Sequence, residues 1–88
     1  MWYYDWDDTK NQWLKQNRGV SFEEVVMLIE SNNLLDLISN TSKYPGQRVF
    51  VIDIEGYAYL VPFVEEGQRI FLKTLFPSRK ATKKYIKN

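Results

Sequence analysis

Seven cationic side chains and no acidic one fall in the last twenty residues of this 88-residue chain. Residues 1–68 hold five Lys or Arg and all eleven acids, so a region of net charge −6 precedes a block of +7. Such a block attracts phosphate and releases counterions when it binds nucleic acid. The alternatives are a solvated tail that aids solubility, or a tail that pairs with the acidic region. The cations are Arg69, Lys73, Arg79, Lys80, Lys83, Lys84 and Lys87.

Several kinds of chemistry are excluded by residues that the chain lacks. It contains no His and no Cys, which excludes imidazole acid–base catalysis, histidine or thiolate metal sites, and disulfides. Its acids occur mostly in pairs, at 7–8, 23–24 and 65–66, where helix caps and turns account for them. Its four glycines stand apart, so no phosphate-binding loop is present. We expect no metal and no cofactor.

Length and composition indicate one folded domain. Eighty-eight residues leave no room for a second domain. A hydrophobic content of 44% and an aromatic content of 16% are typical of a packed core rather than a disordered chain. The N-terminus lacks a basic segment followed by an apolar one, and no apolar run is long enough to span a membrane. We therefore expect a cytoplasmic protein with no membrane partner.

The N-terminal third predicts a short strand followed by two helices. Residues 2–6 alternate aromatic and polar side chains, as a strand does. Asp7 or Asp8 is a suitable N-cap for a helix to about residue 17, in which Trp13 and Leu14 would face inward. Ser21 and Glu24 form a capping box that opens a second helix, which ends near residues 31–33.

The rest of the chain predicts strands. Residues 34–39 could form a strand or a last helical turn, and we favour the strand. Pro45-Gly46 predicts a turn in the polar loop 40–47, and Pro62 predicts an edge or a bulge because proline donates no ladder hydrogen bond. Ser78 can cap a short helix with Ala81 and Tyr85 on one face. The other strands are expected over residues 48–55, 57–65 and 69–76.

This element order predicts an α+β fold. A short N-terminal strand and two helices would pack on an antiparallel β-meander of three to four strands. Both helices would lie on one face of the sheet, and a short basic segment would follow the last strand.

Three segments carry a family resemblance. They are Trp6-Asp7-x-x-Lys10, Gly19-Val20-Ser21-Phe22-Glu23-Glu24 and Ser78-Arg79-Lys80-Ala81-Thr82-Lys83-Lys84. In this order and spacing the chain resembles the BrnT-like toxins of bacterial type II toxin–antitoxin systems. The resemblance implies a single RelE/ParE-like toxin domain over residues 1–88. It also implies ribonuclease activity that inhibits translation, and a hetero-oligomer with a small antitoxin encoded by the adjacent gene.

A ribonuclease without histidine would depend on lysine and arginine. Arginine grips phosphate in a bidentate manner and stays charged, whereas lysine can exchange a proton. We expect Lys10, Arg18 and Arg79 to surround the scissile phosphate, without a metal. Lys80 would steer RNA, and Lys83 and Lys84 continue the same basic run. Tyr57 and Tyr59 would offer rings on which bases stack.

The sequence also supports a second kind of function. Arg18 stands where the family usually has histidine, which favours a non-catalytic toxin-fold module that binds a protein partner or nucleic acid. A third possibility is a small structural protein that binds neither. The adjacent reading frame and the fate of RNA mixed with the purified protein would distinguish these three functions.

Overall fold

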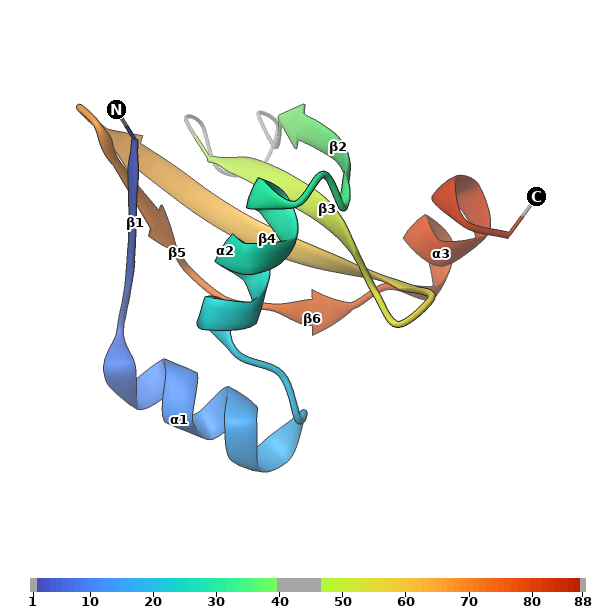
Figure 1. The fold of residues 1–88 in the computed structure, drawn as a ribbon, viewed down its shortest axis with the longest axis horizontal. Helices are drawn as coiled ribbons and strands as arrows, with labels where there is room; N and C mark the ends of the chain where they lie inside the picture. The colour runs from blue at the N-terminus through green and yellow to red at the C-terminus, as the bar shows by residue number, and fades with distance from the viewer. Residues whose placement is uncertain (1, 40–46, 88) are drawn as a thin grey trace.

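The computed structural model describes residues 2–39 and 47–87, so the turn predicted at Pro45-Gly46 lies outside the described residues. No helix in these two ranges is long and apolar enough to cross a membrane. Figure 1 shows the order of the elements along the chain. They are β1 (Tyr3–Trp6), α1 (Asp8–Asn17), α2 (Phe22–Glu30), β2 (Leu34–Ser39), β3 (Arg48–Ile54), β4 (Tyr57–Glu66), β5 (Arg69–Leu72), β6 (Phe76–Pro77) and α3 (Arg79–Tyr85).

The sheet has six strands and is mixed. Its order is β1-β5-β4-β3-β2, and β6 pairs with β4 beyond the end of β5. β1 runs parallel to β5, with Tyr3 opposite Arg69, whereas the other pairs are antiparallel. The α+β class is confirmed. The antiparallel meander is present as β2-β3-β4-β5. The sheet is larger than predicted, because β1 joins it in parallel and the strand expected at 69–76 is divided into β5 and β6.

Pro62 lies beside the interval that separates β5 from β6. It is buried in the central strand β4, opposite Val49 of β3. Its carbonyl accepts a hydrogen bond from the backbone N–H of Lys73, just after β5 ends. The backbone of position 62 therefore points away from β3, toward the interval between β5 and β6. No strand partner needs an N–H from proline there, so Pro62 is tolerated inside the sheet at a break in pairing rather than at an edge.

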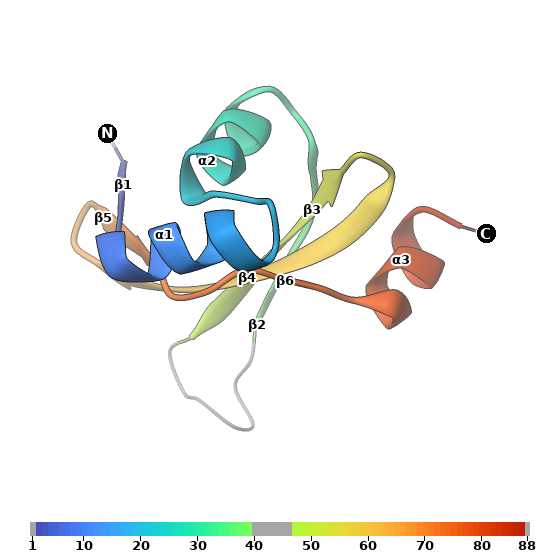
Figure 2. The ribbon, with the colours of Figure 1, turned by 90° about the horizontal axis from the view of Figure 1, so that it is seen from below.

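Helices α1 and α2 cover one face of the sheet, as predicted. The side chain of Asp7 accepts a hydrogen bond from the N–H of Thr9, and that of Ser21 accepts one from Glu24, so both caps form where the sequence predicts them. Figure 2 shows the two helices together on one side. The core beneath them combines Leu14, Val20, Phe22, Val25, Phe50, Ile52, Ile54, Val61, Phe63, Ile70, Leu72 and Leu75.

A third helix, α3, packs on the opposite face. Alternate residues of a strand point to opposite sides, so Val51 lies on the other face from its neighbours Phe50 and Ile52. Val51, Ala58 and Ala81 form a second small core, against which Tyr85 also packs. The prediction that Ala81 and Tyr85 share one helix face is therefore confirmed, and the basic C-terminal segment is a helix held on the sheet.

Hydrogen bonds fasten α3 to β4. Ser78 caps the helix by accepting from the N–H of Ala81, and its own N–H donates to the carbonyl of Ala58 at 2.9 Å. Thr82 is 2% exposed. Its hydroxyl oxygen accepts from the N–H of Ala58 at 2.9 Å, and the hydroxyl donates to the carbonyl of Ser78 at 2.7 Å. A seven-residue helix is too short to be stable alone, so these contacts determine where its charges lie.

Each of the two edge strands, β1 and β2, carries an aspartate that accepts one hydrogen bond from the next backbone N–H and one from a side chain. In β1, one carboxylate oxygen of Asp5 accepts from the next backbone N–H, that of Trp6, at 2.9 Å. Its other oxygen accepts from Arg69 Nε at 3.0 Å. In β2, Asp36 accepts from the next N–H, at 2.7 Å, and its second oxygen accepts from the hydroxyl of Tyr85. A carboxylate on an edge strand blunts pairing with other chains.

Lowering the pH should weaken the hydrogen bonds that Asp5 and Asp36 accept. The Tyr85 hydroxyl, followed by the adjacent N–H, holds the pKa of Asp36 below its ordinary value, and Arg69 does the same for Asp5. A lowered folded-state pKa gives stability that is complete above the unfolded pKa of about 3.9 and is lost as pH falls through the folded value. We expect the free energy of unfolding in urea to decline between pH 5 and 2.5, and to decline less in Tyr85→Phe. An equal decline in both proteins would contradict this.

Candidate nucleic-acid interface

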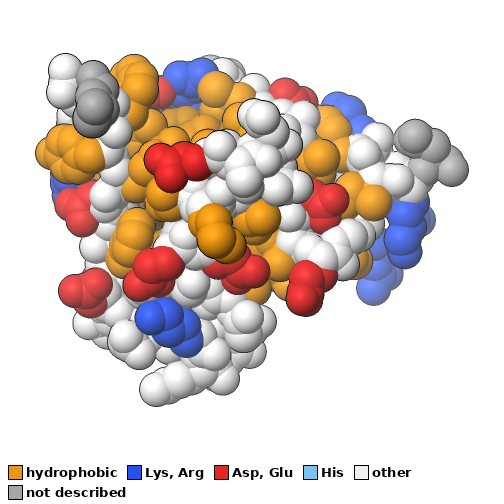
Figure 3. Space-filling model, in the orientation of Figure 1, with side chains coloured by type: hydrophobic (Ala, Val, Ile, Leu, Met, Phe, Trp, Pro, Cys, Tyr) orange, Lys and Arg blue, Asp and Glu red, His pale blue; other side chains and the backbone are white. Residues whose placement is uncertain are grey.

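Helix α3 carries four exposed cations, Arg79, Lys80, Lys83 and Lys84. Figure 3 shows Lys and Arg side chains gathered at this end of the molecule. Within residues 2–39 and 47–87, none of the four forms an ion pair within 4.0 Å. They stand in two pairs of like charge at i,i+4 spacing, and each such pair destabilises a helix by about 0.2–0.5 kcal/mol. An anion bound over the helix would relieve that repulsion.

Arg69, another cation of the basic block, is paired with acidic side chains. Arg69 pairs with Asp5 at 3.0 Å and with Glu66 at 2.7 Å. Its guanidinium also lies over the ring of Phe71, 4.7 Å from the centroid. The expectation that acids of the first 68 residues neutralise part of the block is therefore confirmed for Arg69. Lys73 and Lys87 are exposed as well, but the four cations of α3 are the ones that stand together on one helix.

A second basic feature lies on α1, around Trp13. The ammonium of Lys10 lies 4.6 Å from the centroid of the Trp13 ring, and the guanidinium carbon of Arg18 lies 4.9 Å from it. Trp13 was expected to face inward, but it is 42% exposed. The helix turns Asn11 and Leu14 into the core instead, so Trp13 lies on the flank between two cations. A cation over an indole face is a favourable contact, and an exposed ring can stack on a base.

The structure brings together two of the three predicted catalytic residues. Lys10 and Arg18 meet at Trp13, and Arg18 Nη1 also donates to the carbonyl of Leu75 at 2.6 Å. Arg79 begins α3, and Figures 1 and 2 both place α3 and α1 on different sides of β6. One phosphate surrounded by all three residues is therefore not the arrangement seen.

The two tyrosines are separated from the lysines they were expected to assist. Tyr57 and Tyr59 contact each other edge to face, with ring centroids 6.2 Å apart. Tyr59 packs against the core beneath α1 and α2. Lys80 and Lys84 line a groove on the opposite face of the sheet. The tyrosine rings and these lysines therefore do not form one surface.

That groove lies between β2 and α3 and has a volume of about 240 Å³. Its floor is apolar, made by Ile38, Val51 and Leu60, and Lys80 and Lys84 stand at its side. No sequence pattern identifies the groove, because it depends on α3 packing beside an edge strand that is distant in the chain.

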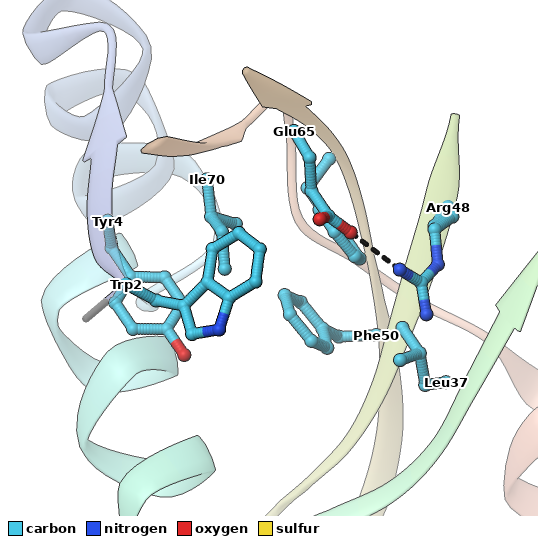
Figure 4. A pocket seen from close by; sticks show the side chains of 8 residues that line it. Trp2, Tyr4, Leu37, Arg48, Phe50, Glu65 and Ile70 are labelled. Carbon is cyan, nitrogen blue, oxygen red and sulfur yellow. Dashed lines mark hydrogen bonds and ion pairs between the residues drawn. The ribbon is translucent and has the colours of Figure 1, made fainter. Parts of the chain in front are cut away.

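A second hollow, of about 220 Å³, opens on the α1–α2 face between β1 and β2. Figure 4 shows Trp2, Tyr4 and Phe50 around it, with the ion pair between Arg48 and Glu65 at its side. Burial, and then the carboxylate of Glu30, raise the pKa of the Tyr4 phenol. This hollow is aromatic and has no lysine in its lining, so it differs in chemistry from the groove beside α3.

The described residues therefore hold two basic surfaces, the cations of α3 and the Lys10–Trp13–Arg18 cluster of α1. Both suit a polyanion with stackable bases, because one supplies charge and the other adds an exposed ring. Among the residues that the structure describes, no three Asp or Glu side chains come together in a way that could hold a metal ion. Comparison of the chain with protein-family models, with curated proteins and with solved structures gives no match.

Proposed function

We propose that this chain is the toxin of a type II toxin–antitoxin pair, a metal-independent ribonuclease with a RelE/ParE-like fold that inhibits translation. The observation that carries the proposal is the row of four exposed cations on α3, a helix fastened to the sheet by Thr82 and Ser78. The segments that resemble BrnT-like toxins supply α3, the turn into α2 and the start of α1. The proposed partner is an antitoxin encoded by the adjacent gene.

RNA would contact both basic surfaces. Its phosphates would lie along the cations of α3, and a base would stack on the exposed ring of Trp13. Arg18 lies within the same contact network, because it touches Trp13 and the carbonyl of Leu75, four residues before Arg79. The two surfaces would hold separate nucleotides of one strand.

Cleavage would use the 2′-hydroxyl of the RNA. This group gives its proton to a solvent water molecule and attacks the adjacent phosphorus. The bond from phosphorus to the 5′-oxygen breaks, and that oxygen leaves with a proton from the protein, giving a 2′,3′-cyclic phosphate. In this proposal the Lys10 ammonium supplies the proton for the leaving oxygen. Arg18 neutralises the charge that develops on the scissile phosphate, and Arg79 holds another phosphate of the same strand, as arginine is suited to do.

Expression of the chain alone tests this proposal. We expect growth arrest with loss of mRNA, and we expect Arg79→Ala to abolish both, because it removes a phosphate contact at the start of α3. Lys15→Ala is the matched control, since Lys15 is an exposed cation on α1 that pairs with Glu23 at 3.6 Å. Normal growth at good expression of the unmodified chain would refute the proposal.

A non-catalytic RNA-binding module is the second candidate. It is favoured by the placement of Arg18, whose guanidinium already contacts Leu75 and Trp13, and by the separation of α1 from α3. Such a module would bind RNA with strong salt dependence but leave it intact. Incubation of purified protein with RNA in EDTA, followed by electrophoresis, distinguishes the two, because only the ribonuclease yields 2′,3′-cyclic ends.

A further inference from the structure

The groove between β2 and α3 combines an apolar floor with positive charge. Ile38, Val51 and Leu60 provide an apolar floor, and Lys80 and Lys84 provide positive charge beside it. Ile38 is 37% exposed although it is a large aliphatic residue on a strand. An apolar floor with cations at its side fits a segment that presents both apolar and acidic side chains.

Within the described residues, the groove also borders an edge strand of the sheet. β2 pairs with β3 and is the last strand in the described part of the sheet. An extended peptide can lie along such an edge and place alternate side chains into pockets beside it. Asp36 already meets the N–H of Leu37, so the edge is partly closed. The side chains of the groove, rather than a continuous ladder of backbone hydrogen bonds along β2, would then select the segment that binds.

The charge around the groove favours an acidic occupant. Four exposed cations on α3 have no ion pair within 4.0 Å among the described residues, and two of them line the groove. The acids of β2 and β3, Asp36 and Asp53, lie on this face of the sheet. Asp36 accepts from Tyr85, and Asp53, opposite Ala58 in the sheet, accepts from the N–H of Gly56. Neither of these two described residues forms an ion pair with α3 within 4.0 Å. In the aromatic hollow on the other face, the cation in the lining, Arg48, is paired with Glu65.

We propose that the groove binds an extended segment of the antitoxin in which apolar and acidic residues alternate. The apolar side chains would cover Ile38, and the acidic ones would pair with Lys80 and Lys84. Because these lysines also belong to the RNA-binding surface of α3, the bound segment and RNA would compete. The inference rests on the proposed function, since it names the surface by which the partner of that toxin neutralises it.

Two adjacent residues of β2 provide a matched test. Ile38 lines the groove, whereas Leu37 lines the aromatic hollow on the opposite face, and the two side chains are 37% and 38% exposed. Ile38→Asp should weaken binding of the antitoxin by about thirtyfold or more, as expected for a buried interface anchor, when measured by calorimetry. Leu37→Asp should leave the affinity within about threefold, because side-chain changes outside an interface's central anchors have small effects. Circular dichroism checks that both variants fold.

Growth assays separate this inference from the proposed function. Ile38→Asp should still arrest growth, and co-expressed antitoxin should no longer rescue it, whereas Leu37→Asp should be rescued normally. Rescue of Ile38→Asp, or equal loss of rescue in both variants, overturns the inference while the toxin proposal stands. If the unmodified protein forms a dimer and Ile38→Asp dissociates it, the inference is also overturned, since a second copy of the chain would then fill the groove. If the unmodified chain neither arrests growth nor binds the neighbouring protein, both proposals fail.

Discussion

Replacing Asn11 by leucine is expected to destabilise the fold by about 1–3 kcal/mol, because it leaves a buried backbone donor without a partner. Asn11 is 2% exposed. Its Oδ1 accepts from the N–H of Phe22 at 2.8 Å, and its Nδ2 donates to Glu23 Oε1 at 2.7 Å. The Asn11 side chain, on α1, therefore provides a hydrogen-bond acceptor for the first turn of α2, where N–H groups have no partner inside the helix. Leucine has a similar size but forms neither bond.

Urea unfolding followed by circular dichroism measures this effect. Asn17→Ala is the matched control, since Asn17 is an exposed amide on the same helix that donates to the carbonyl of Trp13. It should change the free energy of unfolding by less than about 0.5 kcal/mol, as is usual at the surface. The free energy of unfolding of Asn11→Asp should fall between those of Asn11→Leu and Asn17→Ala, because its carboxylate can still accept from the N–H of Phe22 but repels Glu23. Equal stability of Asn11→Leu and the unmodified chain would show that the bridge between α1 and α2 is dispensable.

The features that the sequence predicts best depend on short-range interactions. Ser21 and Ser78 each accept from a backbone N–H three residues later, so the signal for both helix starts lies within four residues. The two-residue turns at Glu55-Gly56 and Gly67-Gln68 are also local. They connect β3 to β4 and β4 to β5, and the strand ends that flank them lie within one residue of the bounds that the sequence predicts. The alternation of side chains from residue 48 likewise separates Phe50, Ile52 and Ile54 from Val51, and the two sets are buried in the cores on opposite faces of β3.

The features that the sequence does not predict depend on contacts between distant segments. The parallel pairing of β1 with β5 joins residues more than sixty positions apart, and no local pattern distinguishes it from a separate strand. Trp13 shows the same limit within the candidate site. Its large apolar ring favours burial, yet Asn11 takes an inward position because it bonds to the start of α2. Lys10 and Arg18 could then meet on the exposed ring.

Replacing Thr82 by valine is expected to detach α3 and to weaken RNA binding together with stability. Valine keeps the shape but removes the hydroxyl, so the buried N–H of Ala58 loses its acceptor, at a cost of about 1–3 kcal/mol. The remaining contacts must then hold a helix of seven residues, which is too short to persist alone. The cations of α3 would lose their fixed spacing, and their combined grip on phosphates would fall.

Fluorescence anisotropy with a labelled single-stranded RNA, alongside urea unfolding, measures both effects. Thr82→Ser is the matched control because it keeps the hydroxyl and loses one methyl group, worth about 0.8 kcal/mol. We expect it to bind RNA nearly as the unmodified chain does, and Thr82→Val to bind about tenfold more weakly while its sheet remains folded. RNA affinity that is the same in both variants would mean that the charge of α3 suffices for binding. The fixed position of the helix would then have no role in recognition, which separates a shaped site from a basic tail.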